Sequence, residues 1–306
     1  MSQSRLRVSV KGLELDNPTM LASGVLGYSA ESLESVVEGG AAAVVTKSVG
    51  AEARVGYANP TVVQVSCGLL NALGLPNPGV DEFAQEIRRI KSVLRVPVIV
   101  SVYGYSEDEY AMTAKKVVAA GGDAVELNLS CPHVKKTGSE IGQDPQMLAA
   151  TVRRVKGSVN KPVMVKLSPN VTSIVDLGRA AERAGADVLT AINTVKGVAV
   201  DAETMMPVLS NKVGGLSGPA VKPVALRCVY ELFEHVKVPI VGCGGVSSWR
   251  DAAEFLLAGA SAVQVGTAVA LKGVCVFREI TRGLNVYLKR KGFGSVREIV
   301  GLSHRS

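Results

Sequence analysis

Aromatic side chains are scarce in this sequence: Phe, Trp and Tyr together make up 4% of its 306 residues. Charged residues are also few at 20%, whereas apolar residues reach 47%. This composition lacks the aromatic-rich surface that is typical of binding interfaces. Gly, Ala and Val are abundant instead, and they suit buried parallel strands that pack closely against helices.

Cysteine is sparse too, and its spacing fits no metal site. No Cys-x-x-Cys pair occurs among Cys67, Cys131, Cys228, Cys243 and Cys275. The spacing argues against an iron–sulfur cluster or a structural zinc held by this chain alone. The segment Met1 to Lys11 has no hydrophobic core of a signal peptide. We therefore expect a cytoplasmic protein that binds no metal.

A long uninterrupted apolar run is missing as well. The most apolar stretch, 256–277, is broken by Gly259, Gly266 and Gly273 and contains Lys272, which argues against a membrane span. The net charge of +7 comes from short, scattered clusters. Such clusters are typical of solvated helix faces and add only a mild preference for anionic ligands. We expect neither a membrane nor a nucleic-acid partner.

What the chain does have is a repeated junction of small residues and glycine, followed by an apolar strand. The junction occurs at 39–45, 121–127, 184–190 and 258–264. Four more apolar runs bring the strands to eight: Thr19–Ala22, Pro97–Val102, Pro162–Leu167 and Pro239–Val241. Helical patterns separate the strands. Eight such units, without a dinucleotide fingerprint after the first strand, favour a TIM (β/α)8 barrel over a doubly wound sheet. We expect residues 1–306 to form a single β/α-barrel domain.

Two connections are long, 49–96 after strand 2 and 195–238 after strand 6. Both follow the carboxyl ends of strands, where barrel enzymes build their active sites. Long loops inside a compact domain are often functional. The first carries Asn-Ala-Leu-Gly-Leu-Pro-Asn-Pro-Gly at 71–79, and the second carries Gly-Gly-Leu-Ser-Gly-Pro at 214–219. We expect the substrate to lie beneath them.

Polar residues close the predicted strands one after another. They include Ser23, Lys47, Ser48, Asn128, Ser130, Cys131, His133, Lys166, Ser168, Asn170, Asn193, Thr194 and Thr267. The carboxyl ends of parallel barrel strands meet at one rim. So many amides, hydroxyls and ammonium groups on that rim predict a site for a polar, anionic, planar ligand.

The glycines after strands 7 and 8 suggest where a phosphate binds. Bare backbone N–H groups at Gly244, Gly245, Gly266 and Thr267 can approach phosphate oxygens, and Gly218 adds another approach point. Any one of these glycines is equally well explained as an ordinary turn residue. Together they favour a phosphate site.

Two lysines and one cysteine are candidates for the chemistry. Lys47 and Lys166 project from strand interiors, where a lysine is costly unless it meets an anion. Each could compensate a ligand charge, form a Schiff base as in barrel aldolases, or simply extend to the barrel mouth. Cys131 lies in the loop after strand 4 and can accept a proton if the site favours its thiolate. An inert small residue is the alternative.

At this point the sequence resembles the dihydroorotate dehydrogenase family. The resemblance rests on five motifs in the family's order, which span nearly the whole chain: Asn-Leu-Ser-Cys-Pro at 128–132, Asn-Ala-Leu-Gly-Leu at 71–75, Lys-Leu-Ser-Pro-Asn-Val at 166–171, Ile-Asn-Thr at 192–194 and Gly-Gly-Leu-Ser-Gly-Pro at 214–219. With cysteine at position 131 the chain resembles the class 1 members, whereas membrane-bound members have serine there. The Ser-Pro-Asn-Val and Ile-Asn-Thr motifs resemble those of the NAD-linked class 1B catalytic subunit.

The resemblance implies one FMN across the barrel mouth. The residues implied to contact it are Ser23, Lys47, Ser48, Asn128, Lys166, Ile192, Gly218, Gly244, Gly245, Gly266 and Thr267. Those implied to hold dihydroorotate or orotate are Lys47, Asn71, Ala72, Leu73, Gly74, Leu75, Asn128, Asn193 and Thr194. Asparagines suit a ring that alternates N–H and C=O groups.

The resemblance also implies the catalytic roles. Cys131 would act as the general base that removes the C5 proton of dihydroorotate, while hydride leaves C6 for the flavin N5. Lys166 would stabilise the negative charge that grows on the reduced flavin. The expected reaction is the oxidation of (S)-dihydroorotate to orotate in the biosynthesis of pyrimidines (UMP).

Electrons must then leave the flavin, and the resemblance implies a partner for them. The NAD-linked subtype uses a subunit that carries FAD and a [2Fe–2S] cluster, in a heterotetramer of two of each chain, with the catalytic chains paired as a homodimer. If fumarate reoxidised the flavin directly, the homodimeric subtype would be the correct assignment.

Two residues depart from the family pattern, and other functions stay open. His133 replaces a common asparagine, and Ser101 stands where an asparagine often contacts the flavin. His133 is the best support for a rival substrate, dihydrouracil or dihydrothymine, since related dihydropyrimidine dehydrogenases carry histidine there. A Schiff-base aldolase and a non-catalytic phosphate-binding barrel rank far lower.

Overall fold

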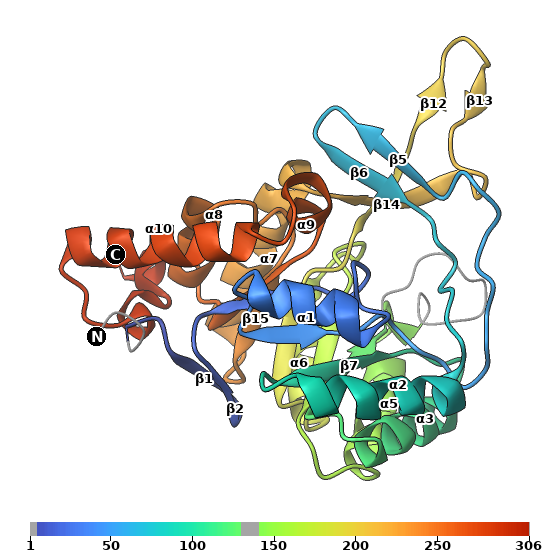
Figure 1. The fold of residues 1–306 in the computed structure, drawn as a ribbon, viewed down its shortest axis with the longest axis horizontal. Helices are drawn as coiled ribbons and strands as arrows, with labels where there is room; N and C mark the ends of the chain where they lie inside the picture. Colours follow the sequence, from blue (N-terminus) through green and yellow to red (C-terminus); the bar gives the residue numbers. More distant parts are fainter. Residues whose placement is uncertain (1–4, 130–140, 306) are drawn as a thin grey trace.

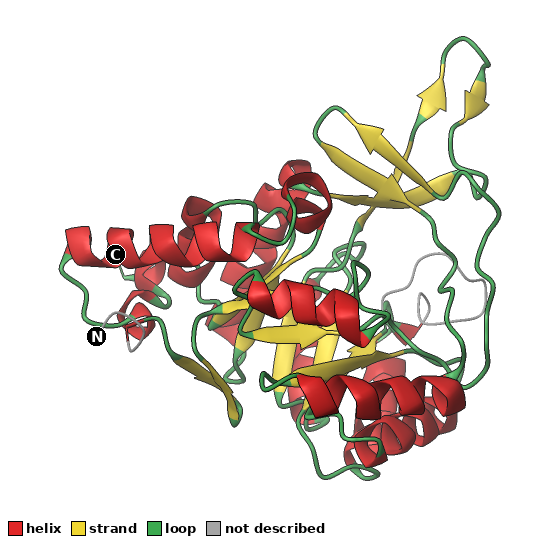
Figure 2. Cartoon of the chain, viewed as in Figure 1, coloured by secondary structure: helices red, strands yellow, loops and turns green. Residues whose placement is uncertain are grey.

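The computed structural model describes residues 5–129 and 141–305. Eight parallel strands close a barrel, which helices surround (Figures 1 and 2). In chain order the barrel strands are β3 (Thr19–Leu21), β4 (Ala43–Val45), β7 (Val98–Val102), β8 (Ala124–Asn128), β9 (Val163–Leu167), β10 (Val188–Ala191), β15 (Ile240–Cys243) and β16 (Ala262–Val265). Parallel pairing of β16 with β3 closes the ring. The predicted TIM (β/α)8 barrel is confirmed, and each predicted strand overlaps one of these eight.

The helices of the described residues follow the strands and cover the outside of the barrel. They are α1 (Ala30–Glu38), α2 (Val80–Val93), α3 (Glu107–Ala119), α5 (Pro145–Lys156), α6 (Ile174–Arg183), α7 (Lys222–His235), α8 (Trp249–Leu257), α9 (Thr267–Lys272) and α10 (Val276–Lys291). A short hairpin, β1 (Val8–Val10) with β2 (Leu13–Leu15), precedes the first barrel strand. Within the described residues, no helix is both long and apolar enough to cross a membrane.

Local sequence explains why these elements form where they do. Strands such as β7 are buried at every position, as expected of parallel strands that are covered on both faces. Side-chain oxygens of Ser106, Ser173 and Ser248 cap the amino ends of α3, α6 and α8. These caps accept hydrogen bonds from backbone N–H groups that have no partner inside the helix. The apolar faces behind the caps form one continuous core with the barrel strands.

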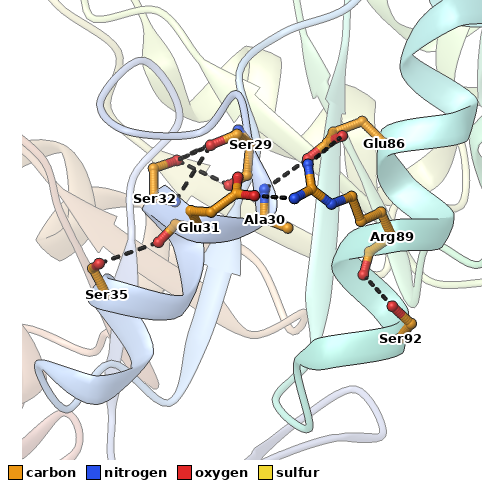
Figure 3. Close-up of polar contacts among 8 residues, drawn as sticks. All are labelled: Ser29, Ala30, Glu31, Ser32, Ser35, Glu86, Arg89 and Ser92. Carbon is orange, nitrogen blue, oxygen red and sulfur yellow. Dashed lines mark hydrogen bonds and ion pairs between the residues drawn. The ribbon is translucent and has the colours of Figure 1, made fainter.

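The amino end of α1 shows how neighbouring helices are tied together (Figure 3). Ser29 and Ser32 form a reciprocal capping box. The Ala30 N–H donates a hydrogen bond of 2.7 Å to the Glu86 carboxylate on α2. Arg89, also on α2, pairs with Glu31 on α1. Carboxylates near a helix amino end also favour its dipole, so these contacts hold α1 and α2 side by side.

The two long connections contain strands that pair with each other. They form an antiparallel sheet in the order β11 (Val195–Val198), β14 (Val213–Ser217), β6 (Gly68–Asn71), β5 (Val62–Val65). We call it the roof sheet. A small hairpin of β12 (Val200–Asp201) and β13 (Met206–Pro207) projects beyond it (Figure 1). The connections lie where the sequence predicts them, after the second and sixth barrel strands, but their strands are an addition that local patterns did not indicate.

Candidate active site

A cavity of about 520 Å³ lies between the barrel and the roof sheet. Every barrel strand contributes to it at or just past its carboxyl end, and β5, β6 and β14 contribute residues from the opposite side. This is the face on which barrel enzymes place their active sites, and the volume suits a cofactor or another small molecule. The predicted position of the substrate beneath the two long connections therefore coincides with a real cavity.

Most of the residues singled out from the sequence come together here. The lining includes Ser23, Lys47, Ser48, Asn71, Leu73, Leu75, Asn128, Lys166, Ile192, Asn193, Thr194, Gly218, Gly244, Gly245, Gly266 and Thr267. Ala72 and Gly74 do not line the cavity: Ala72 is buried in a small core with Leu70, and Gly74 packs against Tyr57. Residues 71, 73 and 75 thus line the cavity, although the backbone leaves the extended conformation at Gly74 and Leu75, whose φ angles are +77° and +58°. Cys131 and His133 lie outside the described residues.

A chain of hydroxyl and amide groups runs along one side of the cavity. Ser48 is its centre: its hydroxyl lies 2.8 Å from that of Ser101 and 3.4 Å from that of Ser23. Asn128 donates to Ser48 at 3.0 Å, and Asn193 donates to Asn128 at 3.2 Å. Ser101 thus supports the lining through Ser48, and it lines the cavity itself. Hydrogen bonds in a row fix the direction of each amide.

Lys47 brings a second kind of group to the same wall. Its side chain is only 6% exposed, and its ammonium lies 5.5 Å from the centre of the Tyr28 ring. Such a cation–π contact favours the charged amine. The positive charge at this point makes the cavity suitable for a ligand with a carboxylate or another anionic group.

Lys166 lies on the cavity floor within a buried network that the sequence analysis missed. Its ammonium donates 2.9 Å to the Gln264 side-chain oxygen and lies 3.6 Å from the Glu126 carboxylate. Gln264 and Thr190 both donate to Glu126, at 2.6 Å and 3.0 Å. A signal did exist in the sequence, because Glu126 and Gln264 interrupt apolar strands, where a polar side chain needs a partner.

The network determines the charge of Lys166. Burial alone would lower the pKa of this amine, but the Glu126 carboxylate 3.6 Å away opposes that effect, and the pKa is raised above its ordinary value. Burial also raises the pKa of Cys243, so that residue is a neutral thiol at neutral pH. Glu126 is then the anion that keeps Lys166 charged.

The opposite end of the cavity is built from glycines. Gly244 and Gly245 have φ angles of +123° and +81°, which side chains with a Cβ rarely adopt. A Cβ on Gly245 would lie 2.7 Å from the Lys222 Cβ. Their exposed backbone offers hydrogen-bond donors to an anion. Lys272 also lines this end, and the Thr267 hydroxyl donates to Ser217 at 2.8 Å.

Comparison with known proteins agrees with this geometry. A family model described as dihydroorotate dehydrogenase matches residues 5–288. The protein of Pyrococcus furiosus named dihydroorotate dehydrogenase B (NAD(+)), catalytic subunit, is 52% identical over 98% of this chain and 99% of its own length. Proteins of the same name from Methanosarcina acetivorans and Methanothermobacter thermautotrophicus are 51% and 50% identical, over 97% and 98% of this chain and 95% and 98% of their own. The resemblance of the motifs is thereby confirmed, and the chain belongs to the dihydroorotate dehydrogenase family.

Proposed function

We propose that this chain is the catalytic subunit of an NAD-linked dihydroorotate dehydrogenase, which oxidises (S)-dihydroorotate to orotate for pyrimidine biosynthesis. The observation that carries the proposal is the composition of the cavity under the roof sheet. The cavity joins two buried lysines, a row of asparagines and a glycine-rich anion site. The family membership and the names of the relatives support the same reaction.

The residues of the cavity fit a flavin mononucleotide. Gly244 and Gly245 leave bare backbone where a Cβ would collide with Ala225 or Lys222, as close approach to a phosphate requires. The charged amine of Lys166, together with Asn128, Ser48 and Ser23, gives donors for the polar edge of a flavin ring. When bound, FMN would supply the acceptor for hydride.

The substrate would lie between the flavin and the roof sheet. Asn71, Asn193 and Thr194 offer amide and hydroxyl groups to the N–H and C=O groups of a dihydropyrimidine ring. Lys47 offers a buried positive charge for the carboxylate of dihydroorotate. Because dihydrouracil has no carboxylate, Lys47 argues for dihydroorotate against this rival, which His133 favours.

We assign the removal of the C5 proton to Cys131, which lies outside the described residues. Asn128 ends β8 three residues earlier and lines the cavity. The Cys131 thiolate would act as the general base, provided that nearby donors stabilise it. Lys166 would hold positive charge beneath the ring as negative charge develops there.

The electrons would leave through a second protein. The relatives are named catalytic subunits of an NAD(+) enzyme, and such a name fits an assembly with an electron-transfer subunit. We propose that this subunit carries FAD and a [2Fe–2S] cluster, that two catalytic chains pair, and that the cytoplasmic complex contains two of each subunit.

The test begins with the purified chain, its visible spectrum and dihydroorotate without oxygen. We expect a yellow protein that bleaches rapidly, and that NAD reoxidises only after the partner is added. A Cys131→Ala variant should stay yellow and bind orotate, yet bleach at least about a thousandfold more slowly. A protein that takes up no FMN, or that bleaches with dihydrouracil but not with dihydroorotate, would contradict the proposal. Reoxidation by fumarate without a partner would contradict the NAD link.

A further inference from the structure

Glu126 is a carboxylate in the centre of the barrel, with no exposed surface. Its Oε2 accepts hydrogen bonds from Gln264 and Thr190. Its Oε1 accepts none within the described part of the chain and faces the Lys166 ammonium at 3.6 Å. A charge in this position is costly unless it has a partner, so the pairing with Lys166 requires an explanation.

The strand register shows how the amine is held. Lys166 on β9 lies opposite Thr190 on β10 and Asn128 on β8. Gln264 reaches the amine from β16, which is not a neighbour of β9 in the barrel. Because Glu126 accepts from the Gln264 amide nitrogen, the Gln264 oxygen must face Lys166. Glu126 therefore orients Lys166 twice, directly and through Gln264.

Stability alone does not account for this pair. Well-packed apolar residues of similar volume are often as stabilising as a buried ion pair, whereas removal of one partner leaves the other charge uncompensated. Three groups with a charge or a titratable proton surround the amine among the described residues: Glu126 on β8, Cys243 on β15 and Lys47 after β4, which lines the same cavity. Of these, only Glu126 is an anion.

We propose that Glu126 is a positioning residue, which acts through Gln264 and Lys166 to keep the Lys166 amine charged and directed at the ring of the bound cofactor. The inference rests on the proposed FMN site. It predicts that Glu126 adjusts the reduction potential of the flavin without touching it, because a fixed cation stabilises the anionic reduced ring.

The first measurement is the midpoint potential of the bound FMN as a function of pH, for the wild-type holoprotein and for Glu126→Gln. Without its anion, the buried amine loses its proton as the pH rises. Between about pH 6 and about pH 9, the reduced-to-oxidised ratio at a fixed potential should fall roughly tenfold more in Glu126→Gln than in wild type. A Glu126→Asp variant keeps the charge and should restore most of the wild-type profile.

A double-mutant cycle shows whether the effect passes through Lys166. In a Lys166→Met background, Glu126→Gln should change neither the potential nor its pH dependence. The double variant also removes both buried charges, so it remains measurable if Glu126→Gln alone folds poorly. Thr190→Val removes one hydrogen bond to Glu126 but no charge, and its profile should match that of wild type.

Three outcomes overturn the inference. The Glu126→Gln profile could follow the wild type at every pH, or Glu126→Gln could shift the potential equally with and without Lys166. If Glu126→Gln does not fold, the comparison uses Lys166→Met and the double variant. A difference between their FMN midpoint potentials would also overturn the inference. A wild-type protein that binds no FMN fails at an earlier step and overturns the proposed function as well, so the two failures are distinguishable.

Discussion

The side-chain amide of Asn71 donates a hydrogen bond of 3.1 Å to the backbone carbonyl of Gly215, 144 residues further along the chain. The two residues also lie opposite each other in the register of β6 and β14. This contact joins the two long connections directly above the cavity, and Asn71 lines that cavity. One side chain thus helps to build the roof sheet and lines the cavity beneath it.

Replacement of Asn71 by leucine should weaken the binding of substrate more than that of cofactor. The loss of one or two hydrogen bonds costs about 1–2 kcal/mol, so the KM for dihydroorotate should rise roughly tenfold while the FMN content is unchanged. Steady-state kinetics and flavin absorbance measure both quantities. Asn211→Leu is the matched control, because Asn211 also donates to a backbone carbonyl, that of Val213, but does not line the cavity. Equal effects of the two variants would contradict a ligand role for Asn71.

Replacement of Ser101 by alanine should weaken the binding of FMN. The Ser101 hydroxyl lies 2.8 Å from that of Ser48, which also accepts from Asn128. A net loss of about 1 kcal/mol per hydrogen bond corresponds to a dissociation constant for FMN that rises roughly fivefold. Fluorescence titration of the apoprotein with FMN gives this constant. Ser158→Ala, which removes a hydroxyl bonded to the Val155 carbonyl at a helix end, should bind FMN as wild type does.

Gly245→Ala tests the phosphate end of the cavity. The added Cβ would lie 2.7 Å from Lys222 at a φ of +81°, so the loop must shift and its N–H groups lose their approach to an anion. Affinity for FMN should fall at least about tenfold, whereas riboflavin, which has no phosphate, should lose much less. Gly12→Ala separates backbone strain from site geometry: its φ is +82°, but nothing lies within 4 Å of the new Cβ. Similar losses for FMN and riboflavin would refute the phosphate assignment.

The buried phenol of Tyr103 should make the stability of the fold depend on pH in the alkaline range. Burial raises the pKa of Tyr103 to about 12, although the hydrogen bond from Asn77 opposes this shift. The folded protein therefore keeps the phenol proton longer than the unfolded chain does. The resulting stability is complete below about pH 10 and is lost as the pH rises through about 12.

Denaturant unfolding of wild type and of Tyr103→Phe at about pH 9 and about pH 11 measures this effect. The wild type should lose roughly 1–2 kcal/mol more than the variant over that interval. Tyr105→Phe serves as a control, because Tyr105 is an exposed neighbour. If the stability of Tyr103→Phe falls as steeply as that of wild type, then Tyr103 does not cause the loss of stability at alkaline pH.

The barrel was predictable because its signals are local. Each strand is a short apolar run, and four of them follow a glycine junction that ends a helix. The number of strands and their spacing along the chain can therefore be taken directly from the sequence. The gathering of the polar strand-end residues around one cavity was predictable for a related reason, because parallel strands in a barrel carry their carboxyl ends to one rim. Ser48, Asn128 and Lys166 meet there although 118 residues separate the first from the last.

The remaining features depend on partners that are distant in sequence. The roof strands are short, and β6 finds β14 only in the folded chain. Glu126 and Gln264 interrupt apolar strands, but only the closed barrel shows that they bond to each other and to Lys166. Leu73 lines the cavity whereas Ala72 is buried in a small core, and the motif alone does not determine which of the two faces the cavity.

The roof sheet and the barrel closure share a consequence for the synthesis of the protein. A nascent chain exposes β6 long before β14 has been made, and β3 long before β16. Pairing across such separations carries a loop-closure entropy that no early contact repays. The hairpin of β5 and β6 therefore has no partner strand for β6 until the second connection emerges. A product that stalls before β16 has neither a closed barrel nor a ligand site, so premature termination yields inactive protein and never a partly active one.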